Sequence, residues 1–248
     1  MSVYQIIIEY DGTDFVGWQI QKNGPSIQEA IQKILKKILK QKIILYGSGR
    51  TDSGVHAHAQ SAHFVSNKKI IKKVDFLNTL NFFLNKKKIS ILKIKLKKNN
   101  FHARFSAKKR VYKYVIINRI ASLALDLNKA WHIKQPLNTS LMNKAAKLLE
   151  GTKDFSTYRS SSCGAKSPIR TLEKVKINVT KKENKITILF QSQSFLQQQV
   201  RSMVGCLKFV ADGKWSLKKF KFIMDSKKRI NCAPPAPAKG LYLSKVSY

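Results

Sequence analysis

The order of apolar periodicities in the first hundred residues limits the fold more than any other feature of the sequence. A buried run at Ile6 to Ile8 is typical of a strand, and residues 27–38 carry apolar side chains at helical spacing after a capping box that opens at Ser26. Two strand patterns, a short helix and an alternating strand at 92–96 complete the order β-α-β-β-α-β. Because strands outnumber helices and no series of long crossovers follows, this order predicts an α+β domain rather than a doubly wound one.

The rest of the chain has the same kinds of element, without a detectable sequence repeat. The expected elements are strand 110–115, helix 139–150 (ended by Gly151), strands 172–179 and 185–191, a helix that carries Arg201, helix 220–224 and strand 238–243. We therefore predict two halves, residues 1–107 and residues 108–248.

A glycine-rich connection, Gly47 to His56, lies between two of the expected strands, an apolar run at 43–46 and an alternating run at 58–65. Its three glycines permit crowded or left-handed backbone conformations. Arg50 and Asp52 lie two positions apart, and an arginine within a few ångströms favours an ionised carboxylate, which makes Asp52 a candidate nucleophile or base. An Asx turn at Asp52 beside a surface arginine explains the same spacing.

The charge balance favours a polyanionic partner. The formal net charge is +35, from 48 basic and 13 acidic residues. Nucleic acid is the first candidate and an anionic membrane surface the second. Lysine supplies most of the excess and arginine only eight of the 48, a bias that A- and T-rich coding also produces, so part of the excess reflects composition.

Targeting and redox features indicate a cytoplasmic protein. No apolar run approaches the roughly 20 residues that cross a bilayer, and the N-terminus begins directly with a strand pattern instead of a secretory signal. The three cysteines are odd in number and lack metal-type spacing, which is typical of a reduced compartment.

Aromatic side chains stand beside cations in one segment. Tyr112 and Tyr114 share one face of the expected strand at 110–115, with Lys113 and Arg110 close by. Proteins use such pairs to stack on an extruded base and to hold its backbone. Packing in the core explains the two tyrosines equally well.

Five separated segments resemble one known family. Residues 49–57 read GRTDSGVHA and resemble GRTDAGVHA, the signature of the tRNA pseudouridine synthase A family, with Ser53 as the single departure. The patterns YDG…F.GWQ (10–19), FHARFSA (101–107), R.Y.Y (110–114) and the segment 195–205, which resembles F…MVR..VG, follow the family in the same order.

This resemblance implies the fold, the reaction and the partners. The fold is expected to be two similar α/β halves around a central, mostly antiparallel sheet with a basic cleft between them. The enzyme is expected to be a homodimer that grips one tRNA and isomerises uridine to pseudouridine at positions 38, 39 and 40 of the anticodon stem-loop. No atom is gained or lost overall, so we expect no cofactor and no metal, and the target nucleotide must be flipped out.

The resemblance also implies roles for individual residues. Asp52 is expected to be the nucleophile or base that starts glycosidic cleavage, and Arg50 to keep it ionised or to fill the gap left by the flipped base. Tyr112 is expected to stack on the uracil and to help remove the C5 proton, and Arg201 to pair with Asp52 or a phosphate. The residues expected to bind substrate are Tyr112, Arg104, Phe105 and Tyr114.

Two other classes of function remain open from the residues alone. A non-catalytic RNA-binding module uses the same aromatics and lysines but leaves the pairing of Arg50 with Asp52 unexplained. A metal-dependent hydrolase requires a ligand set, for which His56, His58, His63 and Asp52 are the candidates.

Overall fold

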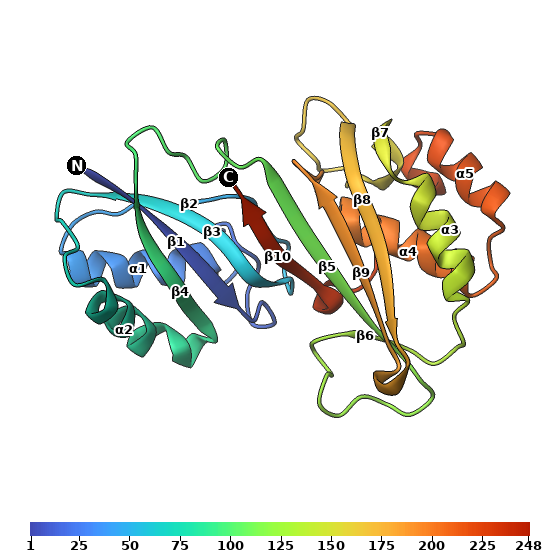
Figure 1. Cartoon of the computed structure of the whole chain (residues 1–248), viewed down its shortest axis with the longest axis horizontal. Helices are drawn as coiled ribbons and strands as arrows, with labels where there is room; N and C mark the ends of the chain where they lie inside the picture. The colour runs from blue at the N-terminus through green and yellow to red at the C-terminus, as the bar shows by residue number, and fades with distance from the viewer. The chain divides into compact units, whose positions relative to one another are not determined.

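The computed structural model describes all 248 residues and divides them into two compact units. The first unit combines Met1–Lys108 with Tyr242–Tyr248, and the second is Lys109–Leu241. Each unit contains strands with helices beside them (Figure 1), and the strand pairs are mostly antiparallel. The expected α+β class is therefore confirmed. None of the helices has both the length and the apolar character that a membrane span requires.

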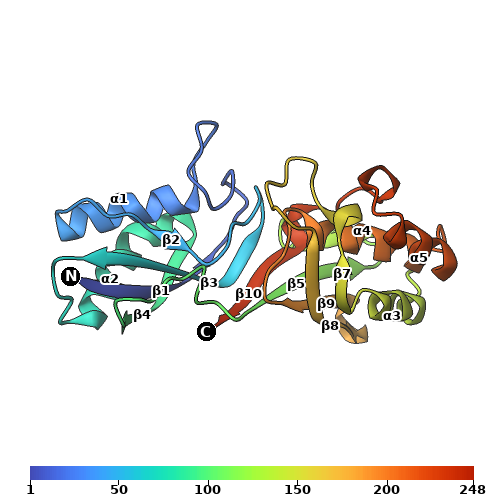
Figure 2. The ribbon, with the colours of Figure 1, turned by 90° about the horizontal axis from the view of Figure 1, so that it is seen from above.

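The first unit is built on a sheet with the strand order β4-β1-β3-β10, in which β2 also pairs with β3. Its strands are β1 (Ser2–Tyr10), β2 (Tyr46–Gly47), β3 (His56–Ser66), β4 (Ile89–Lys97) and β10 (Leu241–Ser247). Its helices, α1 (Ile27–Leu39) and α2 (Lys73–Leu84), lie on the same face of this sheet (Figure 2). The element order of the first hundred residues is thus the predicted one.

Helix α1 forms as the periodicity predicts. The Ser26 hydroxyl accepts a hydrogen bond from the Glu29 backbone N–H (3.3 Å) and satisfies one donor at the helix start. Ile27, Ile31 and Leu35 are fully buried on the face that covers the sheet. A complete burial of this kind stabilises a fold by about 1.5–3 kcal/mol for each aliphatic side chain.

The apolar run before the glycine-rich connection is shorter as a strand than expected. Only Tyr46 and Gly47 pair with β3, opposite His63 and Ala62. Leu45 instead bonds to helix α1: its N–H donates to the Gln32 side chain (2.8 Å), and its carbonyl accepts from the Gln28 side chain (2.7 Å). The buried backbone is satisfied by side-chain amides of α1, so no partner strand is needed.

The last strand lies with the first unit, which corrects the expected division at residue 107/108. Strand β10 runs parallel to β3, with Tyr242 opposite His56 and Leu243 opposite Ala57. The Tyr242 ring stacks between the rings of His56 and His58, at 4.8 Å from each. The chain therefore returns to the first unit after it has formed the second, and these contacts hold its last strand there.

The second unit has the antiparallel order β5-β9-β8-β7, and β6 pairs parallel to β5. Its strands are β5 (Lys109–Asn118), β6 (Trp131–Ile133), β7 (Gly151–Asp154), β8 (Ile169–Thr180) and β9 (Lys185–Ser192). Its helices are α3 (Thr139–Leu148), α4 (Gln199–Ala211) and α5 (Leu217–Asp225), which gather beside β7, β8 and β9 (Figure 1). Strands β6 and β7 were not predicted, because three and four residues are too few to establish an alternating pattern.

Candidate active site

The Asp52 loop, defined here as residues 48–55, connects β2 to β3. Thr51 is buried in this loop, and its hydroxyl lies 2.8 Å from the Tyr10 hydroxyl. The Thr51 carbonyl accepts a hydrogen bond from the Trp18 N–H (3.1 Å), and the Asp52 carbonyl accepts one from the Val55 N–H (3.2 Å). The backbone on both sides of Asp52 is therefore held in place, while the Asp52 side chain remains half-exposed.

The N-terminal segment 10–18 supports this loop through two glycines. A methyl group on Gly12 would lie 2.0 Å from the Val55 carbonyl oxygen. Gly17 has a φ of +115°, and a methyl group there would lie 2.5 Å from the Thr51 carbonyl oxygen. Only glycine permits so close an approach of two backbones. The Gly12 N–H also donates to His56 Nδ1 (3.1 Å), so both ends of the loop are fastened to the same segment.

Arg50 is exposed and lies on the same loop as the half-exposed Asp52. An exposed ion pair contributes only about 0–1 kcal/mol and costs side-chain entropy, so spacing alone does not enforce it. The expected pairing of Arg50 with Asp52 stays a prediction.

Arg104 and Phe105 lie on a tight turn after β4. The turn is closed by hydrogen bonds between His102 and Ser106, from the Ser106 N–H to the His102 carbonyl (2.9 Å) and from the His102 N–H to the Ser106 hydroxyl (3.0 Å). The Arg104 guanidinium lies 5.5 Å from the centre of the Phe105 ring, and Phe105 is 76% exposed. An exposed aromatic ring beside a cation offers a stacking surface to an unpaired base.

Tyr112 and Tyr114 share a face of β5, as predicted, but their surroundings differ. Tyr112 is 8% exposed and makes an edge contact with Phe195, at 5.1 Å between ring centres. Tyr114 is fully buried, and its hydroxyl donates to the Pro237 carbonyl (2.8 Å). Burial raises the pKa of Tyr114 well above its ordinary value. Tyr114 is therefore buried in the core, and its expected role in substrate binding stays a prediction.

Arg201 lies in the first turn of α4, where a cation is unfavourable. The positive end of the helix dipole disfavours a positive side chain there by about 0.3–1 kcal/mol. Arg201 is half-buried, and its Nε donates to the Ala236 carbonyl (2.8 Å), while its own carbonyl accepts from the Ala236 N–H (2.9 Å). The first hydrogen bond holds the guanidinium and the second holds the backbone of Arg201, so both groups are fixed to Ala236.

The histidines considered for a metal site serve the fold of the first unit. His63 Nδ1 accepts from the Ala103 N–H (3.1 Å), and His56 Nδ1 lies 3.0 Å from an Asp11 carboxylate oxygen. No group of three or more histidine, cysteine, aspartate or glutamate side chains is placed to hold a metal ion. His63 thus connects β3 to the turn that carries Arg104.

His63 makes the first unit sensitive to acid. Burial, and then the neighbouring His102, lower the pKa of His63 from 6.5 to about 4. Between these two pH values the unfolded chain binds a proton that the folded chain does not, so stability falls as the pH falls. The loss reaches roughly 3 kcal/mol below pH 4. Urea titrations at pH 7 and pH 4.5 measure this loss.

The His63→Gln variant separates this contribution from the titration of the carboxylates. We expect it to be less stable at pH 7 but to lose less stability on acidification than the unchanged protein. His132→Gln, a half-buried histidine of the second unit, is the matched control and should leave the acid sensitivity unchanged. Equal acid sensitivity in all three proteins would contradict the assignment to His63.

Comparison with known proteins identifies relatives that match this chain over its full length. A family model described as tRNA pseudouridine synthase matches residues 6–106 and 145–248. The tRNA pseudouridine synthase A of Pelagibacter ubique (strain HTCC1062) is 58% identical over 248 residues, which is 100% of both chains. The proteins of that name from Afipia carboxidovorans and Rhizobium meliloti are each 42% identical over the full length of both chains. The chain belongs to the tRNA pseudouridine synthase A family.

Members of the tRNA pseudouridine synthase A family convert uridine in tRNA to pseudouridine. The family and the enzyme class expected from the sequence, an isomerase that acts on tRNA, are thus confirmed. The matched ranges contain the Asp52 loop, its N-terminal support and the Arg201 helix. The sequence analysis included segment 10–18 in the family resemblance but did not predict that this segment supports the Asp52 loop. The signal was present in Gly12 and Gly17, two glycines on either side of Phe15.

Proposed function

We propose that this enzyme isomerises uridine to pseudouridine at positions 38, 39 and 40 of the tRNA anticodon stem-loop, with Asp52 as nucleophile or base. The observation that carries the proposal is the Asp52 loop, in which a half-exposed carboxylate projects from a backbone fastened at Thr51 and Val55. Holding a reacting group in one geometry is a large source of rate enhancement.

The reaction can be divided into steps, each of which requires only one or two side chains of the enzyme. The bond between uracil N1 and ribose C1′ breaks, the freed ring turns over, and C5 bonds to C1′. The C5 proton then leaves and N1 gains a proton, so the overall composition is unchanged and no cofactor is called for. Asp52 starts the cleavage, and Tyr112 contacts the uracil and helps remove the C5 proton.

The arginines and Phe105 act on the rest of the nucleotide. Arg50, exposed beside Asp52, occupies the gap that the flipped base leaves in the stack. Arg104 and Phe105 contact the RNA near the target, through charge and stacking respectively. Arg201 neutralises a phosphate or the Asp52 carboxylate. Each of these roles is supported by exposure or by positioning hydrogen bonds on the residue itself.

Pseudouridine mapping on an unmodified tRNA with uridines at positions 38 to 40 tests the proposal. Carbodiimide labelling and primer extension, in the presence of EDTA, should give stops at those positions only. Binding without any stops would favour the RNA-binding module instead. Stops at other uridines would keep the reaction and overturn the assigned positions. Loss of stops on addition of EDTA would contradict the absence of a metal.

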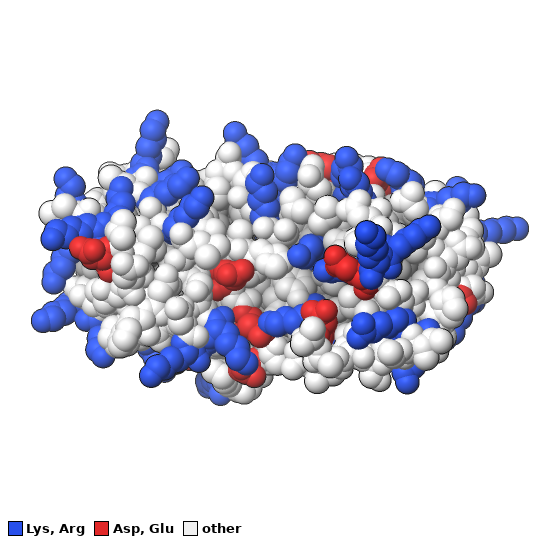
Figure 3. Space-filling view, turned by 60° about the horizontal axis from the view of Figure 1, so that its bottom comes forward, with Lys and Arg blue, Asp and Glu red and all other residues white.

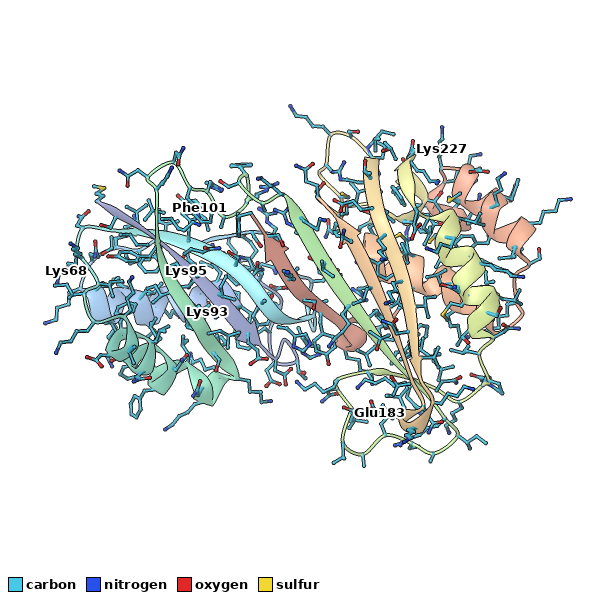
Figure 4. All side chains as sticks on the ribbon, viewed as in Figure 1. Lys68, Lys93, Lys95, Phe101, Glu183 and Lys227 are labelled. Atoms are coloured by element: carbon cyan, nitrogen blue, oxygen red, sulfur yellow. The ribbon has the colours of Figure 1, made fainter.

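Lysines supply the part of tRNA binding that does not depend on sequence. Lysine and arginine side chains spread over the face seen in Figure 3, and several acidic side chains lie between them, mostly near the middle of the face. Figure 4 shows Lys93 and Lys95 along β4, and Lys68 in the connection that leads from β3 to α2. The lysines of this connection, Lys68, Lys69, Lys72 and Lys73, are all exposed. Such contacts depend on salt because they release counterions.

Replacing these four lysines by glutamine should make the affinity for tRNA depend less steeply on salt concentration. Each lost phosphate contact lowers the slope of log K against log salt by about 0.7–0.9. Filter binding between low and moderate salt measures the slope, and mapping of the variant should still give positions 38 to 40. An unchanged slope would show that this connection does not contact the tRNA.

The proposal includes a homodimer in the cytoplasm, where unmodified tRNA and reduced thiols occur together. Apolar side chains of the connection between β5 and β6 support a covered surface, since Leu125 is 97% exposed and Ile120 is 83% exposed. Sedimentation equilibrium tests the assembly. A species of 28.3 kDa alone, at every protein concentration and with tRNA absent, would contradict the dimer.

A further inference from the structure

Two of the three cysteines form a close pair in the second unit. Cys206 lies on α4 and is fully buried, and Cys232 follows the short 3-10 turn Arg229–Asn231 and is half-buried. Their sulfur atoms are 3.4 Å apart, and neither forms a disulfide. A disulfide requires about 2.05 Å between sulfurs, so a movement of little more than 1 Å would join them. Neither residue belongs to the site proposed above.

The surroundings of this pair favour a thiolate on Cys232. A hydrogen bond from the Cys206 thiol, and then the Arg229 guanidinium, lower the pKa of Cys232, while the same hydrogen bond and burial raise the pKa of Cys206. Arg229 is itself held by a hydrogen bond from its Nη1 to the Ser202 hydroxyl on α4 (2.8 Å). A partly exposed thiolate beside an arginine is the microenvironment of reactive cysteines.

A buried tyrosine senses the charge of the same pair. Burial, and then negative charge on Cys206 and Cys232, raises the pKa of Tyr158. Asp225 adds a smaller effect of the same sign. The Tyr158 hydroxyl is buried without a hydrogen-bond partner, so it donates to neither sulfur.

We propose that Cys232 and Cys206 form a peroxide-sensitive thiol pair. The Cys232 thiolate attacks the peroxide, takes one oxygen to become the sulfenic acid, and releases water from hydrogen peroxide once a proton is added. The Cys206 thiol then attacks the Cys232 sulfur, and the sulfenic oxygen leaves as a second water while the sulfur–sulfur bond forms. The two thiols lose two electrons in total, and the peroxide gains them.

The disulfide would act on Arg201 through a short stretch of backbone. Ala236, four residues after Cys232, makes two hydrogen bonds to Arg201, one through its carbonyl and one through its N–H. Drawing Cys232 toward α4 displaces the segment 232–236 and with it the partner of the Arg201 guanidinium. This coupling rests on the proposed role of Arg201, so we expect oxidation to lower turnover by about tenfold and reduction to restore it.

The experiment has a chemical readout that does not depend on activity. The reduced, full-length protein is treated with graded hydrogen peroxide, blocked with N-ethylmaleimide and digested. The expected product is a peptide that joins Cys206 to Cys232, with Cys163 still alkylated. Cys163→Ser is the matched control and should give the same product. Cys206→Ser should stop at a sulfenic acid that dimedone traps on Cys232, and Arg229→Gln should slow the oxidation by about tenfold.

The turnover of the same samples tests whether the disulfide acts on Arg201. Reversible loss of turnover in the unchanged protein, but not in Cys232→Ser, would support it. A mapped disulfide with unchanged turnover would overturn the coupling and leave the thiol pair. No disulfide in either the unchanged protein or Cys163→Ser would overturn the pair itself. A reduced enzyme without pseudouridine formation would contradict the proposed function, while the peptide map would still decide the disulfide.

Discussion

Replacing Asp52 by asparagine should abolish pseudouridine formation while leaving the fold and tRNA binding close to unchanged. Asparagine has nearly the same volume as aspartate and keeps the backbone hydrogen bonds of the loop, which involve the Thr51 and Asp52 carbonyls. It cannot supply the carboxylate that the proposed reaction requires. We expect turnover to fall by at least about 10³-fold, the scale on which the loss of a nucleophile acts in other enzymes.

Single-turnover assays with excess enzyme measure this loss without the influence of product release. Asp14→Asn is the matched control, because Asp14 is an exposed acid of the same unit that pairs with Lys88 (2.8 Å). Thermal unfolding and filter binding should be similar in both variants. Turnover within tenfold of the unchanged enzyme would remove Asp52 from the chemistry. Loss of folding in Asp52→Asn but not in Asp14→Asn would make Asp52 structural.

Replacing Gly12 by alanine should disrupt the Asp52 loop from outside it. The added methyl carbon would lie 2.0 Å from the Val55 carbonyl oxygen, far inside van der Waals contact, and this neighbour is backbone. Segment 10–18 or the loop must therefore move. Overpacking of this kind costs about 1–3 kcal/mol of stability. Because the displaced atoms lie next to Asp52, we expect turnover to fall more steeply than stability, by about 10²-fold or more.

The control for Gly12→Ala is Gly164→Ala, since a methyl group at Gly164 would meet no atom within 4 Å. Urea unfolding gives the stability of both variants, and turnover on tRNA gives their activity. Gly164→Ala should behave as the unchanged protein in both assays. If Gly12→Ala kept full turnover despite a loss of stability, the close approach would be a folding feature with no part in positioning Asp52.

The sequence predicted the element order well where side chains have a clear period. Helix α1 and strand β4 each carry a long regular pattern, and both were found. The pattern could not show that Leu45 would bond to Gln28 and Gln32, because that depends on a helix packed beside it. It also could not assign β10 to the first unit, because pairing with a strand nearly two hundred residues earlier leaves no local signal.

Within the candidate site, the sequence pattern could not distinguish the surroundings of two residues that share one face of a strand. Tyr112 and Tyr114 have the same alternation and are both buried, yet Tyr112 packs against Phe195 and the Tyr114 hydroxyl donates to the Pro237 carbonyl. Spacing likewise could not show whether Arg50 and Asp52 touch, since two residues of one loop can diverge. The family signature drew attention to the Asp52 loop, and only the three-dimensional structure shows which residues support that loop.

The return of β10 to the first unit has a consequence for synthesis on the ribosome. The unit that carries Asp52 is complete only when residues 242–248 have emerged, because β10 supplies a strand beside β3 and Tyr242 fills the space between His56 and His58. The second unit is continuous in the chain and can close earlier. The nascent polypeptide therefore completes the sheet beside the Asp52 loop last, so an interrupted translation product would expose an unpaired edge of β3 to chaperones.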